Sequence, residues 1–281
     1  MLQPSWLDEV LTLAREAGLA TLRFHPSRSS EEAQSDVSNQ ANSNDMNVRQ
    51  KADASPVTEA DLQANQIIVD GLSKISPDIP IVSEECPGSE RFLSQEGQFW
   101  LVDPLDGTRG FVAGDDEYTV NLALIDQSVS VWGVVYAPIS DRLYWGGAQM
   151  GSRLSAQGEQ RALQLQTLSE LPTVTRVLAS KAHLGPKTVS FVERLGNTEM
   201  IRIGSSLKLC LIAQGQADLY PRLGLTSQWD IAAAQAVLEG AGGTVCDLHG
   251  KPLRYGQSDL ENPYFVASRI DYAAWQHLVD V

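Results

Sequence analysis

The stretch from Phe99 to Phe111, FWLVDPLDGTRGF, constrains the fold of this chain more than any other. It opens with four large apolar residues in a row, which predicts a buried strand. Proline has no backbone N–H and fixes its own φ, so the strand is expected to end at Asp103-Pro104. Asp103 and Asp106 then lie at the strand's C-terminal end, where α/β folds place ligands.

Two interpretations of these acids are open at this point. Carboxylates this close repel each other unless a cation lies between them, and Mg²⁺ prefers such oxygen ligands. Asp and Gly are also ordinary turn residues. On this stretch alone, a metal site and a plain turn are equally good interpretations.

Composition limits the possible partners. The 281 residues are 43% hydrophobic and 20% charged, enough for one large or two modest domains with a core. The net charge of −14 argues against nucleic acid, which needs a basic footprint. A small phosphorylated substrate stays possible, because a metal or a few local cations can outweigh the overall charge.

Cysteine usage and the N-terminus suggest a compartment. Three cysteines at long spacings, without a CxxC pair, support neither a disulfide framework nor a zinc site, so a reducing compartment is expected. The first residues, MLQPSWLDEV, lack the features of a secretory signal, and no apolar run is long enough to span a bilayer. We therefore expect a cytoplasmic protein without a transmembrane segment; its oligomeric state cannot be read from the sequence.

The first part of the chain alternates between helix and strand signals. Apolar residues at helical spacing predict helices over 5–24 and 59–72, separated by a polar segment, 25–50, that we expect to be a mobile loop. Strands are predicted over 79–82, 118–126, 129–137 and 142–145, the last three forming an antiparallel meander. A polar stretch at 149–161 suggests a boundary, giving an N-terminal α+β domain over 1–155.

The second part, 156–281, reads as an α/β domain. Strands are predicted over 174–180, 200–203, 217–220, 244–246 and 264–267, and helices over 205–214 and 229–239. Strands and helices that alternate at this spacing are typical of an α/β fold.

Three further acids have ordinary local explanations. Asp61 stands three residues after Thr58, the spacing of a capping box, and Asp230 lies at a helix start where it can compensate the dipole. Glu84 ends a short strand, as Asp103 does. All of them lie at the ends of elements, where distant parts of a chain can converge.

Four motifs taken together resemble the inositol monophosphatase superfamily of Mg²⁺-dependent, lithium-sensitive phosphatases. They are SPVTEAD, VSEE, WLVDPLDGT and WDIAAAQAVLEGAGG, and they span residues 55–243 in the family's order. The resemblance implies a layered αβαβα sandwich with the metals between the two halves. The first domain would carry most of the ligands, and the second would carry Asp230 and the nucleotide-binding residues.

The resemblance also assigns roles to residues. Glu84, Asp103 and the carbonyl of Leu105 would hold a first Mg²⁺, and Asp103, Asp106 and Asp230 a second; a third, weaker ion would lie near Glu84. Catalysis would rest on Asp61 and Thr108, which orient the attacking water, together with Glu84. Gly107 and Thr108 would offer backbone N–H groups to the phosphate, and Asp230 would also contact the substrate.

The second half resembles one branch of the family, the 3'(2'),5'-bisphosphate nucleotidases. The residues that carry this likeness are GSSLK, QGQADLYPR and GKPLRY. Ser205 and Lys208, three apart and so on one helix face, would bind a second phosphate together with Arg222, and His183 would contact the nucleotide. In isolation, Lys208 and Arg222 could equally be cations that reach solvent along apolar surface.

The activity this implies is hydrolysis of adenosine 3',5'-bisphosphate to AMP and phosphate in sulfate assimilation, with its phosphosulfate analogue as a further candidate substrate. Inositol or sugar monophosphate hydrolysis is the alternative, and a catalytically inactive metal- or nucleotide-binding relative is a weaker one. Some members of this branch are peripheral at the bacterial inner membrane, which gives a second option for localisation.

Overall fold

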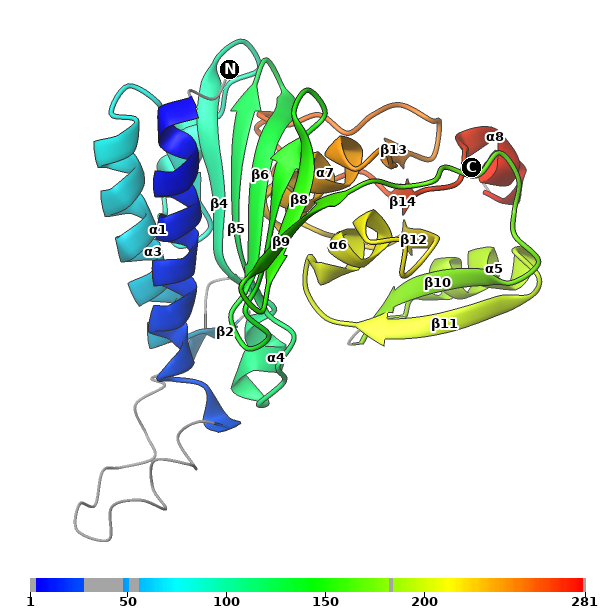
Figure 1. The fold of residues 1–281 in the computed structure, drawn as a ribbon, viewed down its shortest axis with the longest axis horizontal. Helices are drawn as coiled ribbons and strands as arrows, with labels where there is room; N and C mark the ends of the chain where they lie inside the picture. The colour runs from blue at the N-terminus through cyan, green and yellow to red at the C-terminus, as the bar shows by residue number, and fades with distance from the viewer. Residues whose placement is uncertain (1–3, 28–47, 51–55, 182–183, 280–281) are drawn as a thin grey trace, which may run out of the picture.

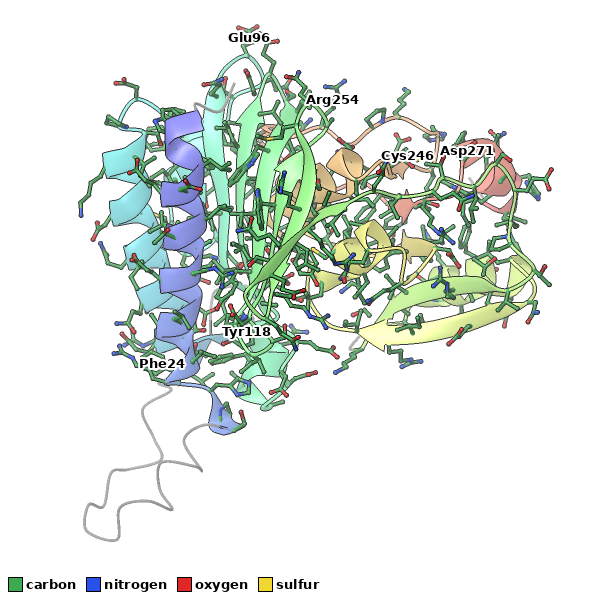
Figure 2. All side chains as sticks on the ribbon, in the orientation of Figure 1. Phe24, Glu96, Tyr118, Cys246, Arg254 and Asp271 are labelled. Atoms are coloured by element: carbon green, nitrogen blue, oxygen red, sulfur yellow. The ribbon has the colours of Figure 1, made fainter. Side chains whose placement is uncertain are left out.

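The computed structural model describes residues 4–27, 48–50, 56–181 and 184–279. Two large β-sheets and three helical layers alternate across the molecule (Figure 1), and their side chains fill the space between the layers (Figure 2). The predicted layered αβαβα sandwich is therefore confirmed. Among the helices of the described residues, none is both long and apolar enough to cross a bilayer.

The first sheet has seven strands in sequence order. They are β3 (Ile81–Ser83), β4 (Gln98–Asp106), β5 (Thr119–Asp126), β6 (Val129–Ala137), β7 (Arg142–Gly147), β8 (Gly151–Ala156) and β9 (Glu159–Leu163). β3 runs parallel to β4 and every later pair is antiparallel, so the predicted meander is confirmed. A separate two-stranded ribbon joins β1 (Arg49–Gln50) to β2 (Pro56–Val57).

Two helices cover one face of this sheet: α1 (Pro4–Leu22) and α3 (Glu59–Ile75) (Figure 1). Their apolar residues recur at helical spacing and pack with Trp100 and Trp132 of the sheet in one buried cluster. Burial of that stripe positions the N-terminus of α3, where Asp61 lies.

The second sheet has the order β11-β10-β12-β14-β13. Its strands are β10 (Thr175–Ser180), β11 (Thr198–Ile203), β12 (Leu219–Arg222), β13 (Thr244–Asp247) and β14 (Phe265–Ser268). β10 runs parallel to both β11 and β12, which requires crossover connections. One crossover is α5 (Pro186–Arg194), which packs with α8 (Tyr272–Trp275) on the outer face.

The central layer consists of α6 (Leu207–Ala213) and α7 (Gln228–Gly240), which lie between the two sheets (Figure 1). One buried cluster joins both helices to residues of both sheets. Shorter elements complete the described chain: α4 (Thr108–Val112) and the 3₁₀ turns Ser89–Phe92 and Gln276–Leu278.

Two local predictions are wrong. β4 does not end at Pro104 but continues to Asp106. Its pairing with β5 is irregular between Asp103 and Asp106, so the N–H that proline lacks is not needed for a regular sheet hydrogen bond there. The helix expected from Ser205 begins only at Leu207, since Ser205 has a left-handed φ of 50°.

The polar stretch at 149–161 folds as the β8–β9 hairpin, so the first sheet extends past residue 155. The division into domains 1–155 and 156–281 stays a prediction. The segment 28–47, most of the predicted mobile loop, lies outside the described residues.

Candidate active site

A pocket of about 630 Å³ opens where the two sheets and the central helices meet. Its walls are the C-terminal end of β4 with α4, the ends of β10, β11 and β12, and the N-terminal ends of α6 and α7. Carboxyl ends of strands and N-terminal ends of helices thus converge on one cavity, as is usual for ligand sites in α/β folds.

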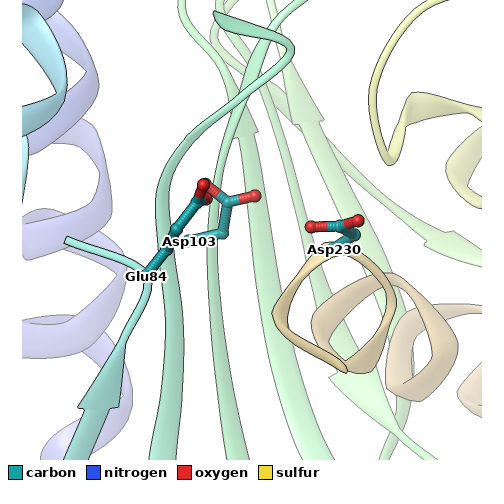
Figure 3. Close-up of side chains that lie close together, drawn as sticks. All are labelled: Glu84, Asp103 and Asp230. Carbon is teal, nitrogen blue, oxygen red and sulfur yellow. The ribbon is translucent and has the colours of Figure 1, made fainter. Parts of the chain in front are cut away.

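Three acids from three separate elements meet at this pocket. Carboxylate oxygens of Glu84, which follows β3, of Asp103 in β4 and of Asp230 in the first turn of α7 all lie within 4.8 Å of one another. Glu84 and Asp103 lie side by side, and Asp230 faces them from α7 (Figure 3). The structure therefore brings together acids that are far apart in the sequence.

The irregular end of β4 determines which groups face the pocket. The Leu105 N–H donates to Asp103 Oδ1 at 3.0 Å, which fixes the carboxylate against its own strand. Asp106, just beyond, accepts the Ser206 N–H on Oδ2 at 2.5 Å. Asp103, Leu105 and Asp106 all line the pocket, as the sequence-based assignment requires.

Burial and mutual repulsion dominate the electrostatics. Burial, then the charges of Glu84, Asp106 and Asp230, raise the pKa of Asp103 well above its usual range. The pKa of Asp230 is raised in the same way by burial and by Asp106 and Glu84. Burial raises the pKa of Asp106 to about 6, although Lys208 opposes the shift.

This set of donors fits a divalent cation. All the side chains offer hard carboxylate oxygens, the ligands of Mg²⁺ and Ca²⁺, and soft or nitrogen ligands are absent from the group. Buried like charges at this spacing are costly without a counter-ion. Glu84, Asp103 and Asp230 therefore form a site that can hold a metal ion.

Asp61 connects to the pocket through Thr108. Its Oδ2 accepts the backbone N–H of Thr58 at 2.8 Å, and its Oδ1 accepts the Thr108 hydroxyl at 3.1 Å. Burial raises the pKa of Asp61, while the bonds from Thr58 and Thr108 lower it. Asp61 therefore caps α3 with Oδ2 and contacts the pocket residue Thr108 with Oδ1.

Two cations, Lys208 and Arg222, also line the pocket. Lys208 is 7% exposed, and burial lowers its pKa to about 8 although Asp106 favours the charged form. Arg222 donates to the Leu225 carbonyl, and among the described residues its buried Nε has no hydrogen-bond partner. Gly107 and Ser205 line the same pocket, whereas His183 lies outside the described residues.

The structure adds residues that the sequence did not single out. Ser206 is buried, its hydroxyl donates to Asn121 Oδ1 at 2.8 Å, and it lies 2.8 Å from Thr119 Oγ1. Glu117 and Lys181 also line the pocket. The sequence contains one indication of this group: the polar residues Thr119 and Asn121 alternate with apolar residues within a largely apolar strand.

Comparisons with known proteins agree with this architecture. A family described as the inositol monophosphatase family matches residues 7–278. The 3'(2'),5'-bisphosphate nucleotidase CysQ of Escherichia coli K12 is 40% identical over 263 residues, covering 93% of this chain and 99% of that protein. The protein of that name from Haemophilus influenzae is 31% identical, with 92% and 91% covered.

A solved structure shows the same fold. CysQ from Bacteroides thetaiotaomicron, described as a bacterial member of the inositol monophosphatase family, superimposes with a TM-score of 0.74 at 31% identity. The match covers 93% of this chain and 96% of that one. On this evidence, the chain belongs to the inositol monophosphatase family.

Proposed function

We propose that this chain is a Mg²⁺-dependent 3'(2'),5'-bisphosphate nucleotidase that hydrolyses adenosine 3',5'-bisphosphate to AMP and phosphate. Its place would be sulfate assimilation in the cytoplasm, and the phosphosulfate analogue is a second candidate substrate. The observation that carries the proposal is one pocket lined both by the candidate metal ligands Glu84, Asp103, Asp106 and Asp230 and by the cations Lys208 and Arg222. The names of the relatives support the same activity.

Two or three Mg²⁺ ions would be held by the carboxylates of Glu84, Asp103, Asp106 and Asp230 and the carbonyl of Leu105. When bound, they would supply Lewis-acid chemistry, lowering the pKa of water and neutralising phosphate charge. The chain contributes a set of oxygens from both halves of the sequence, with Asp103 buried and Glu84, Asp106 and Asp230 partly buried.

The attacking water would be oriented by Thr108 and Asp61. Because the Thr108 hydroxyl donates to Asp61 Oδ1, its lone pairs are available to accept a proton from water. Asp61, whose pKa burial raises, is suited to take up a proton from Thr108. The water oxygen would then bond to phosphorus as the bond from phosphorus to the 3'-oxygen breaks, and the leaving 3'-oxygen would take up a proton from solvent to become the 3'-hydroxyl of AMP.

The rest of the pocket would hold the two phosphates. Gly107 and Thr108 would offer backbone N–H groups to the reacting phosphate, because the first N–H groups of a helix lack intrahelical partners. Ser205, Lys208 and Arg222 would bind the distal 5'-phosphate. His183 remains a sequence-based assignment to the nucleotide.

The test is a panel of phosphate release with and without Mg²⁺, using adenosine 3',5'-bisphosphate, 3'-AMP and inositol 1-phosphate. Two charge-assisted contacts to the 5'-phosphate, at about 1.5–3 kcal/mol each, predict a preference of about 100-fold or more in kcat/KM for the bisphosphate. Equal rates on inositol 1-phosphate would favour the monophosphatase alternative, and no turnover at all would favour a binding-only relative.

A further inference from the structure

Glu117 joins the two halves of the molecule beside the pocket. It lies in the segment between α4 and β5, and its Oε2 accepts the backbone N–H of Gly204 at 2.6 Å. The same oxygen lies 2.9 Å from Lys181 Nζ. One carboxylate of the first half thus holds both a main-chain donor and a side-chain cation of the second half.

The two residues that Glu117 contacts, Lys181 and Gly204, follow neighbouring strands of the second sheet. β10 and β11 are parallel and adjacent, and their last residues, Ser180 and Ile203, are paired. Lys181 and Gly204 therefore leave the sheet side by side at its carboxyl edge. A Cβ at position 204 would lie 2.8 Å from the Glu117 carbonyl oxygen, so glycine is needed for this close approach.

Two residues of the strand that follows Glu117 hold another residue of the same turn. Glu117 lies two positions before the start of β5, and Thr119 and Asn121 belong to that strand. Thr119 and Asn121 both bind the Ser206 hydroxyl, at 2.8 Å each. The backbone from Gly204 to Ser206 is thereby fixed to the first sheet at both ends.

The geometry of this turn sets the position of Lys208. Ser205, between the two fixed residues, has a left-handed φ of 50°, and its carbonyl accepts the Lys208 ammonium. A non-glycine residue in that region is strained, and the conformation persists only where the surrounding structure enforces it. Lys208 is therefore oriented by a turn that β5 holds in place.

We propose that Glu117 is a positioning residue for recognition of the substrate's distal anionic group. It acts through Gly204 on Ser205 and Lys208, and the inference rests on the proposed bisphosphate nucleotidase function. An anionic side chain cannot itself attract a phosphate. Its charge is balanced by Lys181, which also lies 3.0 Å from both oxygens of Asp115.

The test compares two substrates that differ only in the distal group, adenosine 3',5'-bisphosphate and 3'-AMP. Glu117→Ala removes the bond to Gly204, and loss of such a charge-assisted bond predicts a fall of about 10- to 100-fold in kcat/KM on the bisphosphate, expressed mainly in KM. Hydrolysis of 3'-AMP should change less than about threefold. Glu117→Gln keeps a neutral acceptor for Gly204 and should recover most of the loss, which a general folding defect would not do.

Two further variants test which contact of Glu117 is responsible for the loss of activity on the bisphosphate. Lys181→Met removes the ion pair but leaves the bond from Gly204 to Glu117, so its effect on the bisphosphate should be much smaller than that of Glu117→Ala. Asp116→Asn is the matched control, because Asp116 is the neighbouring acid, its side chain is 63% exposed and it does not line the pocket.

The outcomes separate the two proposals. A wild type that prefers the bisphosphate, with that preference unchanged in Glu117→Ala and Glu117→Gln, overturns the inference alone. A loss in Lys181→Met as large as that in Glu117→Ala also overturns it, because Lys181 would then be the anion-binding group. A wild type that hydrolyses 3'-AMP as well as the bisphosphate overturns the proposed function, and the inference with it.

Discussion

Glu239 is a half-buried acid on α7, away from the candidate active site. Its Oε1 accepts the Gln235 side-chain amide at 2.8 Å, and Gln235 in turn accepts the Tyr255 hydroxyl. Burial raises the pKa of Glu239 from 4.5 to about 7, against the opposing effects of Gln235 and Arg254. This residue should make folding stability depend on pH near neutrality.

We expect Glu239→Gln to stabilise the protein above pH 7. Between pH 4.5 and about 7 the folded state binds more protons at this site than the unfolded state, so the free energy of unfolding falls as pH rises. The glutamine has no charge to bury, and at pH 8 it should gain on the order of 1–3 kcal/mol. Urea unfolding of both proteins from pH 4 to pH 8 measures the difference.

The matched control is Glu193→Gln, the same chemical change at an exposed position on α5. Subtracting the unfolding free energy of the wild type at each pH removes the contribution of the active-site acids, because both proteins contain them. A stability difference for Glu239→Gln that stays constant across this pH range would contradict the expected titration.

Single residues also show where sequence reasoning reaches its limit. The sequence left Asp61 and Asp230 open between helix capping and site chemistry. In the structure the Ser227 N–H donates to Asp230 Oδ2, and the Thr58 N–H to Asp61 Oδ2. A carboxylate has two oxygens, so a local bond does not exclude a distant one, and no local pattern can choose between them.

At the level of elements, α7 approaches the first sheet unusually closely. Its buried face is a run of small residues, among them Ala232, Ala233 and Ala234. Opposite them on β6 stands Gly133, where a Cβ would lie 2.3 Å from the Ala233 carbonyl oxygen. The contact positions the N-terminus of α7, and with it Asp230.

Gly133→Ala should therefore displace α7. Overpacking of this kind costs about 1–3 kcal/mol, and movement of Asp230 should also weaken Mg²⁺ binding. Thermal unfolding and calorimetric titration with Mg²⁺ measure the two effects. Gly224→Ala is the control for stability, since a Cβ there meets no atom of the described part of the chain within 4 Å. Equal melting temperatures for the two variants would refute the close-contact argument.

Elements with strong periodicity were predicted well, and irregular ones were not. Val129–Ala137 was predicted with its observed bounds, because alternation and flanking turns define it locally. The strand through Pro104 was cut short, since its bulge depends on the neighbouring β5. The hairpin β8–β9 was missed because its exposed edge strand is polar, as edge strands often are.

At the level of the whole molecule, the candidate metal ligands come from both parts of the sequence. Glu84 follows β3, and Asp103 and Asp106 lie in β4 of the first sheet, while Asp230 comes much later on α7. Their family roles came from the resemblance, but their meeting could not be derived from spacing, because it depends on how α7 packs between the sheets.

Mg²⁺ should stabilise the folded protein as a whole. Removal of metal with EDTA leaves buried carboxylates to repel one another, and a ligand at 100 times its Kd stabilises by about 2.7 kcal/mol. We expect the melting temperature to rise by about 5 °C or more at saturating Mg²⁺. Differential scanning calorimetry at pH 8 with EDTA and with Mg²⁺ measures the shift.

Asp230→Asn is the control for that shift. The amide can still accept the Ser227 N–H, but it removes a charge that repels Glu84 and Asp106. The variant should melt above wild type in EDTA, gain less from Mg²⁺ and lose most of its turnover. A full Mg²⁺ shift in this variant would place the ion elsewhere.

The position of α7 between the sheets also has a consequence during synthesis. β4 to β9 leave the ribosome long before Gln228–Gly240, which covers their inner face. At about 5–20 residues per second, that apolar face stays open for several seconds. We therefore expect chaperones to bind the nascent chain during synthesis. The N-terminal half expressed alone would lack the helix that covers the inner face of its sheet.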